Sequence, residues 1–175
     1  NKAGMRNEYN KATQDRTFLL LNNNAFTGNG DVISRVTGST AIRETILDAD
    51  GEPLEDAEGN VVTRLFSPEE VFDRVDTPEE LATLREILNY HIVDSFVSQN
   101  TLTLSEQYLV VQTLIPGEDG LISFVRDFEL NIEVNEKDSP LITRFAKGQS
   151  ERVRSHNYVF RNGIGHILND HVRFR

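Results

Sequence analysis

Cysteine is absent from this chain of 175 residues, and its absence excludes several kinds of site at once. Without thiols there are no disulfides, no thiolate zinc ligands and no cysteine nucleophile. Tryptophan is absent too, and many of the 10 Phe lie in strand patterns, which disfavours a sugar-binding site built on exposed aromatic rings. No apolar run approaches the roughly 20 residues that a spanning helix needs, so we expect no transmembrane segment.

Basic residues are few, because 18 Lys and Arg stand against 28 Asp and Glu, for a net charge of −10. An acidic surface repels phosphate backbones, which argues against nucleic acid as a partner. Residues 141–175 reverse this balance, with seven bases and two acids. Two interpretations stay open. This part packs against the acidic remainder or lies on another face, or it forms a basic anion-binding face that includes Arg152 and Arg154.

Residues 1–16 are a polar lead-in without the apolar centre of a signal peptide. Since the chain begins with Asn, we expect a mature or trimmed form, consistent with an upstream leader or lipid anchor. The apolar run 17–21 predicts a buried strand, followed by a helical turn with Asn24 as its N-cap. Residues 28–66 are acidic and rich in turn signals, and strands at 41–47 and 61–66 predict a hairpin-like excursion.

Two helix starts share one pattern, Ser67-Pro68-Glu69-Glu70 and Thr77-Pro78-Glu79-Glu80. Each places a hydroxyl at the N-cap, Pro at the first helical position and Glu where it closes a capping box. The second helix carries apolar residues three and four positions apart, which predicts a face against the core. The side chains expected to be largely buried are Leu84, Ile87, Leu88, Phe128, Leu130, Ile132 and Ile167.

From residue 106 the hydrophobic period changes to two, which is typical of strands with one solvated face. The predicted strands are 108–115, 121–125 and 128–134, with shorter ones near 152–155, 165–168 and 172–174. We find no internal repeat and no low-complexity linker. The order of a strand, then helices, then many strands predicts a single α+β domain over residues 17–175.

Four segments occur in a characteristic order: 17–26 (TFLLLNNNAF), 84–93 (LREILNYHIV), 112–114 (QTL) and 162–168 (NGIGHIL). Together they resemble the signatures of the fasciclin (FAS1) domain family, in the form found in bacterial surface proteins. The positions that carry the motif are Thr17, Phe26, Tyr90, His91, Asn162, Gly163 and His166. The resemblance implies a β-sandwich or wedge of two sheets with helices packed at one edge.

The chain departs from the family pattern. Leu21-Asn22 stands where Ala-Pro is usual, Gly165 replaces a larger apolar residue, and Asn169 replaces an Asp. The lead-in takes the place of the family's leading helices. The stretch before the second signature is longer than usual, so we interpret residues 28–66 as an insertion.

The resemblance implies binding without catalysis. Fasciclin domains are extracytoplasmic adhesion and scaffold modules that engage proteins or glycans at the cell surface. Bacterial copies of this character include lipoproteins of Bacteroidetes, and we expect a cell-surface or outer-membrane location of the Gram-negative type. Two alternatives stay open: an accessory lipoprotein subunit docked on an outer-membrane nutrient-uptake complex, and a carbohydrate-active enzyme with two unmarked carboxylates.

Other chemical interpretations of the polar residues are weaker. His91 projects from the apolar stripe, where a histidine usually holds a structural hydrogen bond. Tyr90 lies in the segment that the family uses for receptor binding in animal matrix proteins. Extended chain would place His166 and Asp170 too far apart to share a metal. We expect no catalytic residue, no metal and no cofactor.

The excursion at residues 28–66 is our predicted partner-binding surface, because acidic, turn-rich insertions carry specificity without disturbing a framework. The candidate side chains are Asp48, Asp50, Glu52, Glu55, Asp56, Tyr90, Arg152 and Arg154. Spacing from Asp48 does not fit a calcium-binding EF-hand loop. An alternative is that the excursion covers an open edge of the domain, with Ile42, Ile46, Val62 and Leu65 buried.

Overall fold

The structure is a computed structural model that describes residues 2–11, 15–26, 32–38, 43–98, 108–126, 132–136, 150–168 and 172. Its helices are α1 Arg6–Tyr9, α2 Asn23–Phe26, α3 Val32–Thr37, α4 Pro68–Asp73 and α5 Pro78–Tyr90, with a 3₁₀ turn at Glu118–Gly120. Its strands are β1 Arg16–Leu21, β2 Arg43–Thr45, β3 Thr63–Leu65, β4 Ile92–Val93, β5 Tyr108–Gln112, β6 Leu121–Arg126, β7 Ile132–Glu136, β8 Ser150–Phe160 and β9 Gly163–Leu168. None of the described helices is long and apolar enough to cross a membrane.

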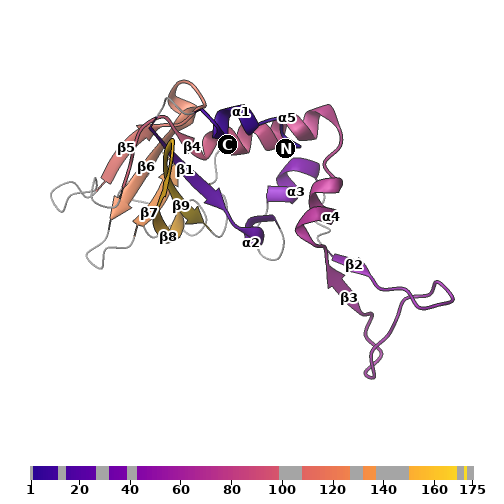
Figure 1. Cartoon of the computed structure of the whole chain (residues 1–175). Helices are drawn as coiled ribbons and strands as arrows, with labels where there is room; N and C mark the ends of the chain where they lie inside the picture. The colour runs from indigo at the N-terminus through magenta and orange to yellow at the C-terminus, as the bar shows by residue number, and fades with distance from the viewer. Residues whose placement is uncertain are drawn as a thin grey trace.

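The elements form an α+β arrangement in which the helices gather on one side of a large sheet (Figure 1). Seven strands follow the order β4-β1-β9-β8-β7-β6-β5, and β1 and β9 are the parallel pair. The ends of this sheet meet, because Val93 of β4 bridges Thr113, just after β5. The backbone N–H of Leu114 also donates to Ile92 O at 2.9 Å. The first and last strands of the seven-stranded order therefore lie close to each other.

Strand β1 divides the interior into two hydrophobic clusters, because alternate side chains point to opposite faces. Phe18 is buried with the helices, and Leu19 is buried with Ile122, Phe124 and other residues of the sheet. The parallel neighbour β9 starts at Gly163 with φ 150°, where a Cβ atom would lie 2.0 Å from Arg16 O. Only glycine allows this close approach.

Both predicted capping boxes are present, at Ser67 before α4 and at Thr77 before α5. Leu84 and Ile87 of α5 are buried as expected, whereas Leu88 and Ile167 are partly buried. Leu88 lines a pocket between α4 and the N-terminal segment. Phe128 and Leu130 lie outside the described residues, as does the side chain of Ile132.

The chain before β1 contributes to the core, although its composition suggested only a polar lead-in. Ala3 and Met5 are buried in the helical cluster, and the Tyr9 ring stacks on Phe18 with centroids 5.5 Å apart. Burial raises the pKa of Tyr9 to about 12. Residues 2–9 therefore belong to the folded unit.

Two local assignments between β1 and β2 need correction. Asn22, rather than Asn24, caps α2, since its Oδ1 accepts from the backbone N–H of Asn24 at 2.9 Å. Residues 28–66 were interpreted as a hairpin-like insertion, yet they include α3, which buries Val32, Ile33 and Val36. The excursion proper is therefore residues 43–65, which carry β2 and β3.

The different burial of two leucines on α5 gives a test of the fold. Leu84→Ala should lower the free energy of unfolding by about 2–5 kcal/mol, because it leaves a cavity in the core. Leu88→Ala, made on the same helix, should cost clearly less since its side chain is already partly exposed. Urea denaturation measures both. Equal losses would contradict the orientation of α5.

Candidate partner-binding surface

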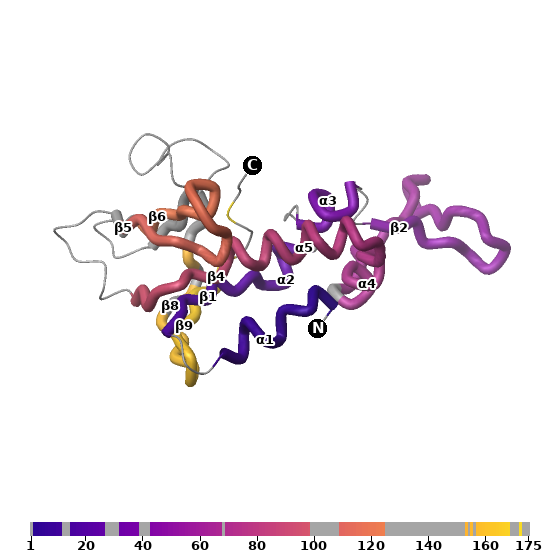
Figure 2. Tube along the Cα trace, turned by 90° about the horizontal axis from the view of Figure 1, so that it is seen from above, coloured from indigo at the N-terminus to yellow at the C-terminus, as the bar shows by residue number. Residues whose placement is uncertain are grey.

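Residues 43–65 form a two-lobed projection, which we call the fork. Figures 1 and 2 show it extending away from the sheet and the helices in both views. Strands β2 and β3 make its stem, with Arg43 paired to Leu65, Glu44 to Arg64 and Thr45 to Thr63. The fork holds seven acids and two arginines, a charge of −5 and thus half of the chain's −10. A stem of three residue pairs thus carries a dense negative charge into solvent.

Arg64 fixes the stem to the helical region. Its Nη1 donates to Glu70 Oε2 at 3.0 Å and its Nη2 to Oε1 at 2.6 Å, while Nη2 also contacts Glu44. Glu70 is the capping-box residue of α4 and accepts from the backbone N–H of Ser67 at 2.7 Å. The Arg64 guanidinium, followed by this N–H, lowers the pKa of Glu70 to about 2. One carboxylate therefore joins the fork to the start of a helix.

Each lobe of the fork is the same tight turn, made by an eight-residue repeat. Residues 47–54 (LDADGEPL) and 55–62 (EDAEGNVV) align with Asp48 on Asp56. Asp48 Oδ1 accepts from the N–H groups two and four residues on at 2.9 and 3.0 Å, and Asp56 Oδ1 does so at 3.0 and 2.9 Å. Gly51 and Gly59 provide the positive φ of 85° and 82° that each turn requires. The expectation of no internal repeat is therefore wrong.

The lobes meet the stem at a junction of three backbone hydrogen bonds. The N–H of Leu54 donates to Ile46 O at 2.8 Å, that of Val62 to Leu54 O at 2.7 Å, and that of Ile46 to Val62 O at 3.0 Å. These residues are eight positions apart, so the repeat sets the junction. The closed ring of bonds gives the two lobes a defined shape rather than that of one long hairpin.

Large apolar side chains are exposed on the fork beside its carboxylates. Leu47 is 57% exposed and Val61 47%, and Leu54 and Leu65 are each 40% exposed. Ile46 and Val62 are half-buried at the junction, and Ile42 lies outside the described residues. The alternative of an excursion that covers the domain's edge does not hold for residues 43–65, which project outward (Figure 1), although α3 of the same region packs into the core. Apolar groups rimmed by charge are characteristic of protein-binding surfaces.

Some of the predicted site residues lie together on the fork, and the others lie elsewhere in the fold. Asp48, Asp50, Glu52, Glu55 and Asp56 all lie exposed on the fork. Tyr90 is 0% exposed, with its hydroxyl donating to Leu121 O at 3.4 Å, so a partner cannot reach it and that assignment is wrong. Arg152 and Arg154 lie on β8, but their side chains fall outside the described residues. Leu47, Leu54 and Val61 were missed, although the repeat placed them beside the turns.

The signature residues instead form a buried framework. Thr17 Oγ1 donates to Ser95 O and accepts from Val97 N–H, both at 2.7 Å. His166 Nε2 donates to Val97 O at 2.7 Å, since a carbonyl only accepts. Two neighbouring strands therefore hold the segment that follows β4.

His91 and Asn162 complete this framework. His91 Nδ1 donates to Ile87 O at 2.7 Å, and its Nε2 accepts from Val172 N–H at 2.8 Å. Asn162 Nδ2 donates to Tyr9 O at 2.7 Å, which ties the N-terminal segment to the β8–β9 turn. Phe26 is buried against Phe72 with ring centroids 4.9 Å apart. Neither ring nitrogen of His91 is open to a substrate.

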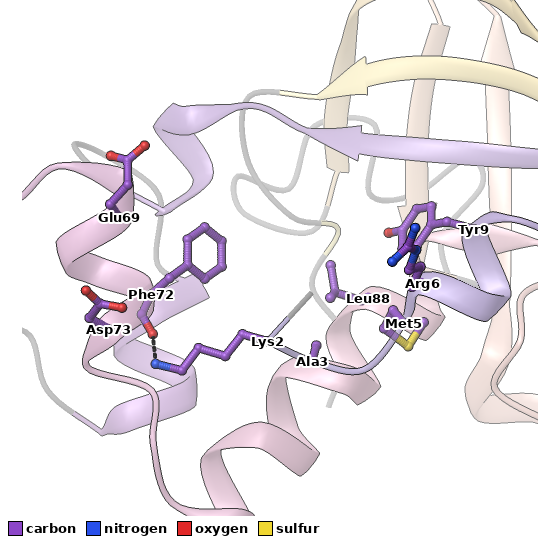
Figure 3. Close-up of a pocket in the computed structure, with 9 residues that line it drawn as sticks. All are labelled: Lys2, Ala3, Met5, Arg6, Tyr9, Glu69, Phe72, Asp73 and Leu88. Atoms are coloured by element: carbon purple, nitrogen blue, oxygen red, sulfur yellow. Dashed lines mark hydrogen bonds between the residues drawn. The ribbon is translucent and has the colours of Figure 1, made fainter.

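Other candidate sites are limited. Within the described part of the chain, no three His, Asp or Glu side chains cluster closely enough to hold a metal ion. Asp170 and His171 lie outside that part. A pocket of about 570 Å³ lies between the N-terminal segment and α4, with Met5, Phe72 and Leu88 on its walls (Figure 3). The Lys2 ammonium donates to Phe72 O across it.

No family model and no curated protein matches this chain. The fasciclin resemblance thus rests on the chain's own residues.

The ion pair at the base of the fork predicts a specific acid response. Glu70 should titrate at about pH 2, and Arg64→Met should raise its pKa toward the ordinary 4.5. Because the folded-state pKa lies below 4.5, the stability from this carboxylate is complete above pH 4.5 and is lost as the pH falls through about 2. Side-chain NMR titration measures both pKa values, with Arg43→Met as the control. A Glu70 pKa near 4.5 in the parent protein would contradict the pairing.

Proposed function

We propose that this chain is a non-catalytic binding module of the fasciclin type, and that it engages a partner protein through the fork. The observation that carries this proposal is the fork itself, an outward projection with exposed aliphatic side chains beside acidic turns. Its large exposed residues are aliphatic rather than aromatic, which favours a protein over a glycan as the ligand. Its charge of −5 favours a basic partner surface.

The arrangement of the signature segments supports the fasciclin assignment. Strand β1 belongs to the first segment, β4 to the second and β9 to the last, and the sheet places them side by side in the order β4-β1-β9. Segments far apart in the chain thus share one hydrogen-bonded unit. This is consistent with a framework role for the motif in the proposed family.

The hydrogen bonds of the two described histidines in the signatures support binding over catalysis. His91 is bonded through both ring nitrogens, and His166 accepts from Asn157 N–H at 3.3 Å while its other nitrogen donates to Val97 O. Both rings are buried. A general acid or base must reach the proton that it transfers, and these rings have other partners.

A cell-surface or outer-membrane location, with an upstream lipid anchor, is part of the proposal and rests on the resemblance alone. A second function is an accessory subunit docked permanently on an outer-membrane nutrient-uptake complex. The 57% exposure of Leu47 and 47% exposure of Val61 favour it, since apolar interfaces are typical of permanent complexes.

Removal of the fork tests the proposal. Joining Thr45 to Thr63 through Asn-Gly deletes both lobes but keeps the stem pairs and Arg64, because a two-residue turn fits an antiparallel hairpin. Affinity capture from the cell envelope of the source organism should recover a partner with the parent protein and lose it with this variant. Circular dichroism should show an unchanged fold, and α3 should remain intact.

Two further variants keep the result interpretable. Leu47→Ser with Val61→Ser tests the same surface at full length, and Val159→Ser removes an even more exposed side chain from the β8–β9 region. The proposal expects loss of the partner with the first and retention with the second. Capture of the same partner by the lobe-deleted protein, with the same salt dependence, would overturn it. Release of the partner by salt separates transient binding from permanent docking.

A further inference from the structure

A polar cavity of about 430 Å³ lies between the N-terminal segment and α5. It shares Met5 with the apolar pocket of Figure 3 but differs from it in chemistry. Three cationic side chains line the cavity: Lys11 after α1, Arg16 at the start of β1 and Arg85 on α5. A concentration of bases is unexpected in a chain with a net charge of −10.

Arg85 and Asn89 supply donors from one face of α5, because residues four apart lie one turn from each other. Arg85 Nε donates to Ala3 O at 3.0 Å, which orients the guanidinium against the N-terminal segment. Among the described residues, no carboxylate forms an ion pair with Arg85. Its two terminal nitrogens therefore retain donors for a ligand, and the side-chain amide of Asn89 lies one turn away.

Arg16 contributes a buried charge to the same cavity. Its side chain is 3% exposed, and Nη1 donates to Glu8 Oε2 at 3.0 Å and to Glu8 O at 3.1 Å. Its Nε lies 3.5 Å from Asp94 Oδ1 and is a buried nitrogen without a hydrogen bond. A buried cation with an unmet donor is costly unless further negative charge approaches.

The charge balance of the cavity remains positive after its own acids are counted. Glu8 is held by Lys11 and Arg16, each at 3.0 Å, and Asp94 offsets part of Arg16. Three cations and two carboxylates leave a surplus of one positive charge. Met5 and Leu114 add apolar wall beside these groups, which suits a ligand with both an anionic and a carbon portion.

We propose that this cavity binds a small organic oxyanion, with its carboxylate or phosphate group held by Arg85, Lys11 and Asn89. The planar guanidinium of Arg85 matches the paired oxygens of either group, and the Lys11 ammonium and the Asn89 amide supply further donors. Arg16 contributes a buried positive charge to the wall of the cavity. The volume lies in the range of small-molecule sites. This site is separate from the fork and does not depend on a partner protein.

Titration with inorganic phosphate and, in parallel, with acetate tests the proposal at constant ionic strength. Backbone NMR shifts should move at residues 85 and 89 with one or both anions and saturate, whereas chloride should not reproduce the change. The stronger of the two anions identifies the group that the site prefers. Arg85→Gln should weaken binding by about tenfold or more, as expected for a lost charged hydrogen bond.

Further variants separate binding from folding. Asn89→Ala removes the side-chain amide but keeps the backbone carbonyl, which accepts from Leu114 N–H. Asn89→Ala and Lys11→Gln should each weaken binding, Arg85→Lys should give an intermediate affinity, and Arg43→Gln on the fork should leave it within about twofold. Shifts no larger than those with chloride, or equal affinity in the parent and in both Arg85→Gln and Asn89→Ala, would overturn the proposal.

Discussion

The segment after β4 is held from two sides, and the connection between the helices and the sheet depends on it. Thr17 from β1 bonds to Ser95 and Val97, and His166 from β9 bonds to the same Val97. The two bonds at Val97 are buried, where each unmet polar group would cost about 1–3 kcal/mol, and the bond to Ser95 is partly buried. Since α5 leads directly into β4, these hydrogen bonds also fix where α5 meets the sheet.

The polar side chains of this framework form hydrogen bonds within the protein. The apolar side chains of the fork, in contrast, stay exposed to solvent. His91, Asn162 and Thr17 each bond to backbone groups of distant segments, His91 through the N–H of Val172. The fork instead leaves Leu47 and Val61 largely in water while its backbone is fixed by the ring of bonds at Ile46, Leu54 and Val62. A projection that is ordered yet apolar at its surface is better explained by binding than by a contribution to the core.

Local signals predicted the local structure. Both capping boxes, the stem of the fork and the burial of Leu84 followed from patterns within a few residues. The errors came from contacts between distant segments. Met5 is buried only because the N-terminal segment lies along α5, and the closure of the sheet at Val93 and Thr113 joins residues that no short pattern connects.

The candidate sites show the same difference between features set by local sequence patterns and features set by contacts between distant segments. The acidic turns were visible in the sequence, and so was the repeat that aligns Asp48 with Asp56, although it was overlooked. Tyr90 was misassigned because helical spacing alone does not show that β6 covers its ring. The cations around the polar cavity come from the segment after α1, from β1 and from α5, so their convergence follows only from the tertiary fold.

The central claim is that a rigid framework carries the fork as an independent surface, and hydrogen exchange tests it most directly. Thr17→Val keeps the shape of the side chain but removes both bonds to the segment 95–97. The account predicts faster exchange at Val97 and in β4, by the equivalent of about 1–3 kcal/mol, with unchanged exchange at Leu54 and Val62 of the fork. Unchanged exchange at Val97, or equal acceleration in the fork, would contradict it.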